Sequence, residues 1–222
     1  MESVSLTRIK TIEDVNNALS LLIKSDSDLA RAYQFVREAG IEVPLRLRPG
    51  GFGGLSEIVI SQLVSKASAS AIHGRFKIHI PTLTPDSCLN AEADTWRAIG
   101  MSRPKQTTLR AIATALKNRS LNLDSLVNLP VEQAVKQLTA IKGIGPWTAD
   151  VYLLFCVGHP DIFPSGDLAL REAAKIIWSL EHRPQDKELR KLASRWSPWR
   201  GIAARLLWAF YAVEKNKKDA MP

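Results

Sequence analysis

Apolar residues recur at the spacing of amphipathic helices along most of the chain. The last long segment has one apolar stripe, formed by Ile202, Leu206, Phe210 and Val213. Residues 103–119 repeat the period with a basic outer face. We expect a further helix over residues 55–76, where the apolar positions that fit the period are 55, 58, 59, 63 and 72.

Signals for helix boundaries support this pattern. Thr11 with Asp14 has the spacing of a capping box and predicts a helix that ends near Lys24. Residues 26–40 predict a second helix that ends at a glycine. A shorter helix is expected to begin at Pro130, because proline is tolerated in the first turn.

Residues 43–54, VPLRLRPGGFGG, interrupt the helical pattern. Their proline and glycine content marks either a boundary between lobes or a mobile connection. Only residues 76–80 alternate as a strand does, and one short strand cannot form a sheet. The sequence therefore predicts an all-α fold.

The overall charge narrows the choice of partner. The 222 residues include 30 lysines and arginines against 22 aspartates and glutamates, which gives a formal charge of +8. A basic surface of this kind favours phosphate-rich partners such as nucleic acid. The length suffices for one large domain or for two small lobes with cores of their own.

The sequence also argues against several protein classes. It has no apolar run of membrane-spanning length, and residues 1–10 lack the apolar core of a signal peptide. We expect a soluble, intracellular protein, in the cytoplasm or nucleoid if bacterial and in the nucleus if eukaryotic. Cys88 and Cys156 are too few for a structural zinc or an iron–sulfur cluster, and we expect both to be buried thiols.

Residues 141–150, IKGIGPWTAD, place two glycines close together before a proline. Gly143 and Gly145 predict a tight turn that leads into a helix starting near Pro146. Unpaired amides at such a turn, with the positive end of the helix dipole, favour an anion such as nucleic-acid phosphate. A dinucleotide fingerprint needs a preceding strand and a third glycine, where Thr148 stands. A plain turn between helices remains the alternative.

Four segments carry a more specific signal. They are ISQLVSKASASAI (60–72), GMSRPKQTTLRAIA (100–113), the stretch from LTAIKGIGPWTAD through FPSGDLALREAAK (138–175) and RWSPWRGIAARLLWAFY (195–211). In order, spacing and residue type they resemble the helix-hairpin-helix DNA glycosylases, specifically the 3-methyladenine DNA glycosylase II branch. The resemblance implies an all-α, two-lobed fold with the active site in the cleft between the lobes. Within a single domain of residues 1–222, we expect one lobe of about residues 1–45 plus 141–222 and another of about 50–140.

The resemblance also implies an activity. Enzymes of this branch hydrolyse the N-glycosidic bond of alkylated purines, such as 3-methyladenine and 7-methylguanine, and require no cofactor. The expected partner is double-stranded DNA containing alkylated bases, and we expect a monomer. Trp147 occupies the slot where strand-cutting relatives carry a lysine that forms a Schiff base, which implies a monofunctional enzyme. A non-catalytic helix-hairpin-helix DNA-binding module is the alternative.

Three residues match one catalytic position and two base-pocket positions of the family. Asp167 stands where the family keeps its catalytic aspartate, although an aspartate after a glycine is also a good helix N-cap. The two roles are compatible, because a helix start stabilises a negative charge. Trp147 and Trp208 match the residues that flank the extruded base. Trp208 falls on a different face from the apolar stripe of its helix, but tryptophans of a helical protein often belong to the core.

Other matched positions concern DNA and ions. Leu63, with Gln62 beside it, matches the residue that wedges into the gap left by the flipped nucleotide; its apolar stripe suggests a core leucine instead. The amides of Gly143, Gly145 and Thr148 would bind one DNA phosphate. The family also binds an alkali cation, Na+ or K+, through main-chain carbonyls that match the following residues: Thr139, Ile141 and Gly143. Val151 departs from the aromatic residue of some relatives, which implies a wider base pocket.

Overall fold

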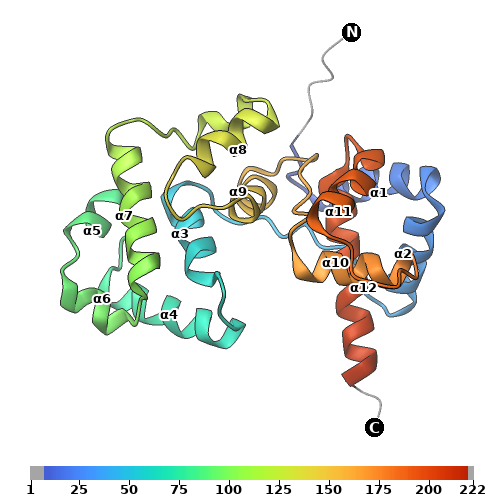
Figure 1. The fold of residues 1–222 in the computed structure, drawn as a ribbon, viewed down its shortest axis with the longest axis horizontal. Helices are drawn as coiled ribbons and strands as arrows, with labels where there is room; N and C mark the ends of the chain where they lie inside the picture. Colours follow the sequence, from blue (N-terminus) through green and yellow to red (C-terminus); the bar gives the residue numbers. More distant parts are fainter. Residues whose placement is uncertain (1–7, 220–222) are drawn as a thin grey trace. The chain divides into compact units, whose positions relative to one another are not determined.

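The computed structural model describes residues 8–219, and within that range it contains helices and no strands (Figure 1). The predicted all-α fold is thereby confirmed. Internal contacts divide the chain into two compact units: a first unit of residues 1–47 and 158–222, and a second unit of residues 48–157. In residues 8–219 no helix combines the length and the apolarity needed to cross a membrane.

The first unit is built around α12 (Arg200–Asp219). This helix contacts α1 (Ile12–Ser25), α2 (Ser27–Glu38) and α10 (Leu168–Ile177), as Figure 1 shows. The shorter α11 (Asp186–Ala193) and the 3-10 turn η3 (Ser194–Trp196) complete the unit. The predicted stripe of α12 is buried at all four positions: Ile202, Leu206, Phe210 and Val213.

The predicted capping box at the start of α1 is present. The backbone amide of Asp14 donates to Oγ1 of Thr11 at 3.1 Å, and the amide of Thr11 donates to Oδ2 of Asp14 at 2.9 Å. Because the first amides of a helix lack partners within it, this reciprocal pair fixes the helix start. The second helix also begins and ends as expected, and its final turn is followed by Gly40 at φ +71°.

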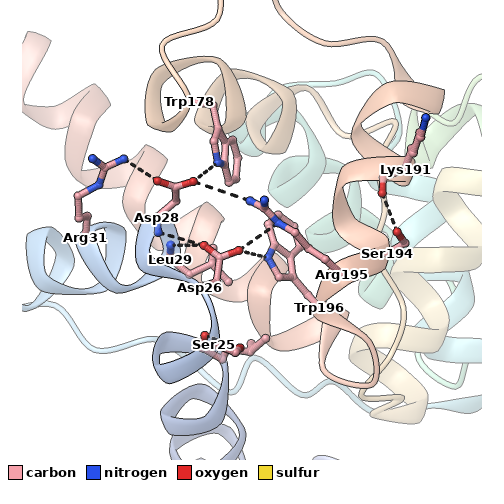
Figure 2. Close-up of polar contacts among 11 residues, drawn as sticks. Ser25, Asp26, Asp28, Leu29, Arg31, Trp178, Lys191, Ser194, Arg195 and Trp196 are labelled. Atoms are coloured by element: carbon pink, nitrogen blue, oxygen red, sulfur yellow. Dashed lines mark hydrogen bonds and ion pairs between the residues drawn. The ribbon is translucent and has the colours of Figure 1, made fainter.

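Asp26 joins α2 to the segment that precedes α12 (Figure 2). Its Oδ1 accepts from the backbone amides of Asp28 and Leu29 at 3.0 and 3.1 Å, which caps α2. Its Oδ2 accepts from the indole Nε1 of Trp196 at 2.8 Å and from Nε of Arg195 at 3.0 Å. One carboxylate therefore satisfies donors from two parts of the unit that are far apart in sequence.

Asp26→Ala is expected to lower the free energy of unfolding by about 2–4 kcal/mol, because it removes a helix cap and leaves the buried Trp196 indole without its acceptor. Urea denaturation followed by tryptophan fluorescence measures this change. Asp94→Ala is the control: Asp94 pairs with Arg97 on the surface, so its loss should cost less than about 1 kcal/mol. Equal losses for the two variants would contradict a linking role for Asp26.

The second unit contains the remaining elements. Its helices are α3 (Gly51–Ser61), α4 (Lys66–His79), α5 (Pro85–Asn90), α6 (Ala93–Ile99), α7 (Arg103–Lys117), α8 (Val131–Thr139) and α9 (Pro146–Tyr152). A 3-10 turn, η1 (Ser125–Asn128), precedes α8, and a π-helical turn, η2 (Leu153–Val157), follows α9. α7 packs against α3 and α5, and α9 packs against α3 and α8 (Figure 1).

The region from residue 55 to residue 80 differs from its prediction in two ways. The single helix expected over 55–76 is two helices, α3 and α4, separated by a turn at residues 62–65. The strand-like residues 76–80 lie almost entirely in α4. Of the three alternating apolar residues, Phe76 and Ile80 are buried while Ile78 is 73% exposed, and Ile80 is the C-cap of α4. The two buried residues are thus one helical turn apart, which is a helical and not a strand spacing.

The observed division of the chain also differs from the expected one. Residues 141–157 belong with residues 48–140 rather than with the C-terminal helices. The reason is packing: α9, which follows the hairpin, contacts α3 and α8. The backbone amide of Arg48 also donates to the carbonyl of Phe155 at 2.8 Å, which holds both ends of the second unit together.

Candidate active site and nucleic-acid interface

The glycine turn at residues 140–145 connects α8 to α9, as the sequence predicts. Gly143 has φ +92°, and a Cβ added there would lie 1.8 Å from Oγ1 of Thr108 on α7. Gly143 is therefore required both by its backbone conformation and by the close approach of α7. Gly145 differs: it is the N-cap of α9 at φ −89°, and a Cβ added there would meet no atom within 4 Å.

The amides of this turn suit an anion. The first backbone amides of any helix have no acceptor within it. In the described part of the chain, no backbone carbonyl accepts from the amide of Gly145 or of Thr148. Gly145 is exposed, and the dipole of α9 adds positive potential at this end. The turn is thus able to bind one phosphate without reading a base sequence.

The two glycines are expected to respond differently to alanine. Gly143→Ala should lower the free energy of unfolding by about 2 kcal/mol or more, because a Cβ would collide with Thr108 at a φ that alanine disfavours. Gly145→Ala, the matched control, should change it by no more than about 1 kcal/mol. Urea denaturation of both variants measures the difference. Similar losses would mean that the turn does not depend on the close approach at Gly143.

Gln62 and Leu63 occupy the turn between α3 and α4. Nε2 of Gln62 donates to Oγ1 of Thr148 at 2.7 Å, which joins this turn to the first turn of α9. Leu63 has φ +54° and is 105% exposed. The alternative of a core leucine is therefore wrong, and the chain presents a bare apolar side chain beside the hairpin helix.

Asp167 is the N-cap of α10, as one of its two expected roles requires. Its Oδ1 accepts from the backbone amides of Ala169 and Leu170 at 3.0 and 3.2 Å. The same oxygen accepts from the indole Nε1 of Trp208, on α12, at 3.0 Å. Three donors and the start of a helix hold this carboxylate in place and stabilise its negative charge.

Four of the six tryptophans fall into two groups by burial; the other two, Trp178 and Trp199, are half-buried against the core of the first unit. Trp96 and Trp196 are each 1% exposed and belong to the cores of their units, as the alternative interpretation expects. Trp208 and Trp147 are half-buried, Trp208 in the first unit and Trp147 in the first turn of α9 in the second unit. The structure brings Trp208 to Asp167; the pairing of Trp147 with Trp208 across a base stays a prediction.

The cysteines are unreactive by environment. Cys88 is buried and Cys156 half-buried, and burial raises the pKa of both thiols to about 11. Within residues 8–219 there is no group of three or more histidine, cysteine, aspartate or glutamate side chains placed to hold a metal ion.

Residues 56–198 match the family model of the HhH-GPD superfamily base excision DNA repair proteins. The chain belongs to this superfamily. Within it, the chain is 31% identical over 174 residues to the DNA-3-methyladenine glycosylase 1 of Schizosaccharomyces pombe, which covers 76% of this chain and 75% of that protein. It is 29% identical over 162 residues to the alkylbase DNA glycosidase-like protein mag2 of the same yeast, covering 71% and 76% respectively.

A solved structure agrees with these matches in fold. The S. pombe 3-methyladenine DNA glycosylase Mag1, in complex with abasic DNA, superposes with a TM-score of 0.77 and 27% sequence identity. The superposition covers 86% of this chain and 95% of that one. The HhH-GPD assignment therefore holds for the fold of nearly the whole chain as well as for its sequence.

Two features of this HhH-GPD protein have no counterpart in the sequence predictions. The hydrogen bond from Trp208 to Asp167 joins residues 41 positions apart, and Trp208 was expected only to line the base pocket. Lys105, on α7, donates from Nζ to the carbonyl of Ile60 at 2.7 Å. The only signal for Lys105 in the sequence is its place in the matched segment 100–113.

Proposed function

We propose that this protein is a DNA glycosylase of base excision repair, which hydrolyses the N-glycosidic bond of alkylated purines in double-stranded DNA. The observation that carries the proposal is the Asp167 carboxylate, held by two backbone amides and the Trp208 indole in a member of the base excision repair superfamily. The names of the relatives, which are glycosylases of 3-methyladenine and alkylated bases, support the choice of substrate.

The proposed chemistry needs one fixed negative charge. As the bond between the sugar C1′ and the purine nitrogen breaks, positive charge develops on the sugar, and a carboxylate nearby stabilises that state. Cleavage releases the alkylated purine as a neutral free base, and water then adds to C1′ and loses a proton, which leaves an abasic site. Trp147 supplies no amine that could attack the sugar, so the strand stays intact and the enzyme is monofunctional.

The proposed base selectivity follows from charge. A purine alkylated at N3 or N7 is cationic, which weakens its glycosidic bond and attracts it to the electron-rich faces of Trp147 and Trp208. Such a base leaves without prior protonation. The four histidines, His73, His79, His159 and His182, lie outside the positions that match the family's catalytic segment, so no general acid is proposed.

A panel of duplexes that carry one lesion each tests this selectivity. We expect 3-methyladenine and 7-methylguanine to be released fastest, hypoxanthine more slowly, and undamaged purines slowest, because neutral bases lack both the labile bond and the cation–π attraction. Single-turnover rates at saturating enzyme give the order. Faster release of uracil or of an oxidised base than of both methylated purines would contradict the alkylpurine assignment.

The proposed grip on DNA uses the hairpin and the turn beside it. The amides of Gly143, Gly145 and Thr148 bind one phosphate, and Leu63 enters the gap left by the extruded nucleotide, with Gln62 at its side.

Three main-chain carbonyls near the turn would hold Na+ or K+: those of Thr139, Ile141 and Gly143. Carbonyl oxygens are suitable ligands for a hard cation. The carbonyl of Ile141 also accepts from the amide of Ile144 at 3.0 Å. We propose that the protein is a monomer and that it acts in the cytoplasm or nucleoid if bacterial, and in the nucleus if eukaryotic.

A further inference from the structure

Leu63 combines two features that a protein normally avoids. Its φ of +54° lies in the left-handed region, which disfavours residues with a Cβ. The residue is 105% exposed, so no side-chain packing in the second unit offsets the cost of this backbone conformation. A projecting leucine in such a conformation persists only where the surrounding backbone is held firmly.

Lys105 supplies part of that support. Its Nζ donates at 2.7 Å to the carbonyl of Ile60, in the last turn of α3, where helix carbonyls lack partners of their own. A positive charge at the C-terminal end of a helix is also electrostatically favourable. Burial lowers the pKa of Lys105, in agreement with an ammonium group partly withdrawn from solvent.

The second support comes from the hairpin helix. Gln62, the C-cap of α3, donates through its side chain to Oγ1 of Thr148 on α9. Thr148 is 2% exposed and is therefore a fixed point of attachment. Leu63 thus follows directly after two anchors: one from α7 through Lys105 and one from α9 through Thr148.

The same face of α7 also contacts the glycine turn between α8 and α9. Thr108 lies one helical turn after Lys105, and its Oγ1 lies against Gly143 so closely that a Cβ there would overlap with it. α7 therefore contacts both the glycine turn and the backbone that carries Leu63. A shift of α7 relative to α3 would move the projecting leucine relative to the phosphate-binding amides.

We propose that Lys105 is a positioning residue for base extrusion: by holding the last turn of α3, it fixes Leu63 in the conformation from which it enters the duplex. This inference rests on the proposed glycosylase function. The alternative is that Lys105 binds a DNA phosphate, as basic residues of DNA-binding proteins usually do. That role predicts a different dependence of excision on base pairing and of DNA affinity on salt.

The test compares two duplexes with the same 7-methylguanine: one with the lesion paired to cytosine, and one with it opposite an abasic-site analogue. The second requires no base pair to be broken, so a wedge matters less. Lys105→Met keeps the apolar stem and removes the donor. We expect it to slow single-turnover excision about tenfold or more on the paired duplex and less than about threefold on the unpaired one.

Two comparisons identify the mechanism. Leu63→Ala should show the same preference for the unpaired duplex, and the double variant should be no slower than Leu63→Ala alone, because both changes remove one function. The slope of log affinity against log salt should stay as in the wild type for Lys105→Met, whereas loss of a phosphate contact would reduce it by about one. Lys117→Met, at an exposed lysine of the same helix that pairs with Asp86, is the control and should change neither rate.

The remaining outcomes would contradict either the positioning role of Lys105 or the proposed glycosylase function. Equal slowing on both duplexes, no slowing, or a reduced salt slope would overturn the positioning role of Lys105. If Lys105→Met does not fold, Lys105→Arg decides: it keeps a cationic donor of different reach and should lose less activity, again mainly on the paired duplex. Failure of the wild-type protein to release 7-methylguanine from either duplex would instead overturn the proposed function.

Discussion

Asp167→Asn is expected to slow base excision by about two to four orders of magnitude and to leave folding and DNA affinity nearly unchanged. The backbone amides of Ala169 and Leu170 and the indole of Trp208 donate to Oδ1 of Asp167, and an asparagine keeps that acceptor. What it loses is the negative charge that stabilises the sugar cation. Single-turnover excision of 7-methylguanine, with fluorescence anisotropy for DNA binding, measures both properties.

Asp26→Asn is a matched control for this result. Asp26 is also an N-cap in the first unit, and it also accepts from a tryptophan indole, that of Trp196. Its replacement should cost stability, since the asparagine nitrogen is a donor and can accept from neither Trp196 nor Arg195, but the folded fraction should excise at the wild-type rate. Near-normal excision by Asp167→Asn would remove Asp167 from the mechanism.

Gly145→Asp is expected to weaken DNA binding about 100-fold or more while the protein remains as stable as the wild type. An added Cβ meets no atom within 4 Å, and aspartate is at least as good an N-cap as the glycine that it replaces at this extended backbone position. The new carboxylate would, however, occupy the place of the phosphate and repel it. Anisotropy titrations at low salt, paired with urea denaturation, separate binding from folding.

Gly74→Asp makes the same change of charge on α4, at another exposed position where an added Cβ has open space. Because it alters only the general field, it should weaken binding less than about tenfold. Undiminished binding by Gly145→Asp, or equal weakening by both variants, would show that the hairpin amides do not hold a phosphate.

Features set by nearby residues could be predicted from the sequence. The capping box of Thr11 and Asp14, the buried stripe of α12 and the N-cap position of Asp167 each depend on residues within one or two helical turns. Such patterns determine local structure because the hydrogen bonds and the apolar face belong to a single element. The tight turn at Gly143 and Gly145 is another feature of this kind.

The remaining features depend on residues that only the fold brings together. Leu63 continues the period of Ile58 and Val59, and residues 62–65 contain neither glycine nor proline to signal a break, so periodicity extended the helix through the turn. The bonds that hold this turn join Gln62 to Thr148, 86 positions apart, and Lys105 to Ile60, 45 positions apart. No local pattern encodes such pairs.

The most direct measurement is the release of free base from methylated duplex DNA by the wild-type protein, with abasic sites counted in the same reaction. We predict 3-methyladenine and 7-methylguanine in solution, one abasic site for each base released, strands intact until alkali treatment, and no protein–DNA adduct after borohydride reduction. Duplex DNA that is bound with no base released would contradict the enzyme and leave a non-catalytic helix-hairpin-helix DNA-binding module.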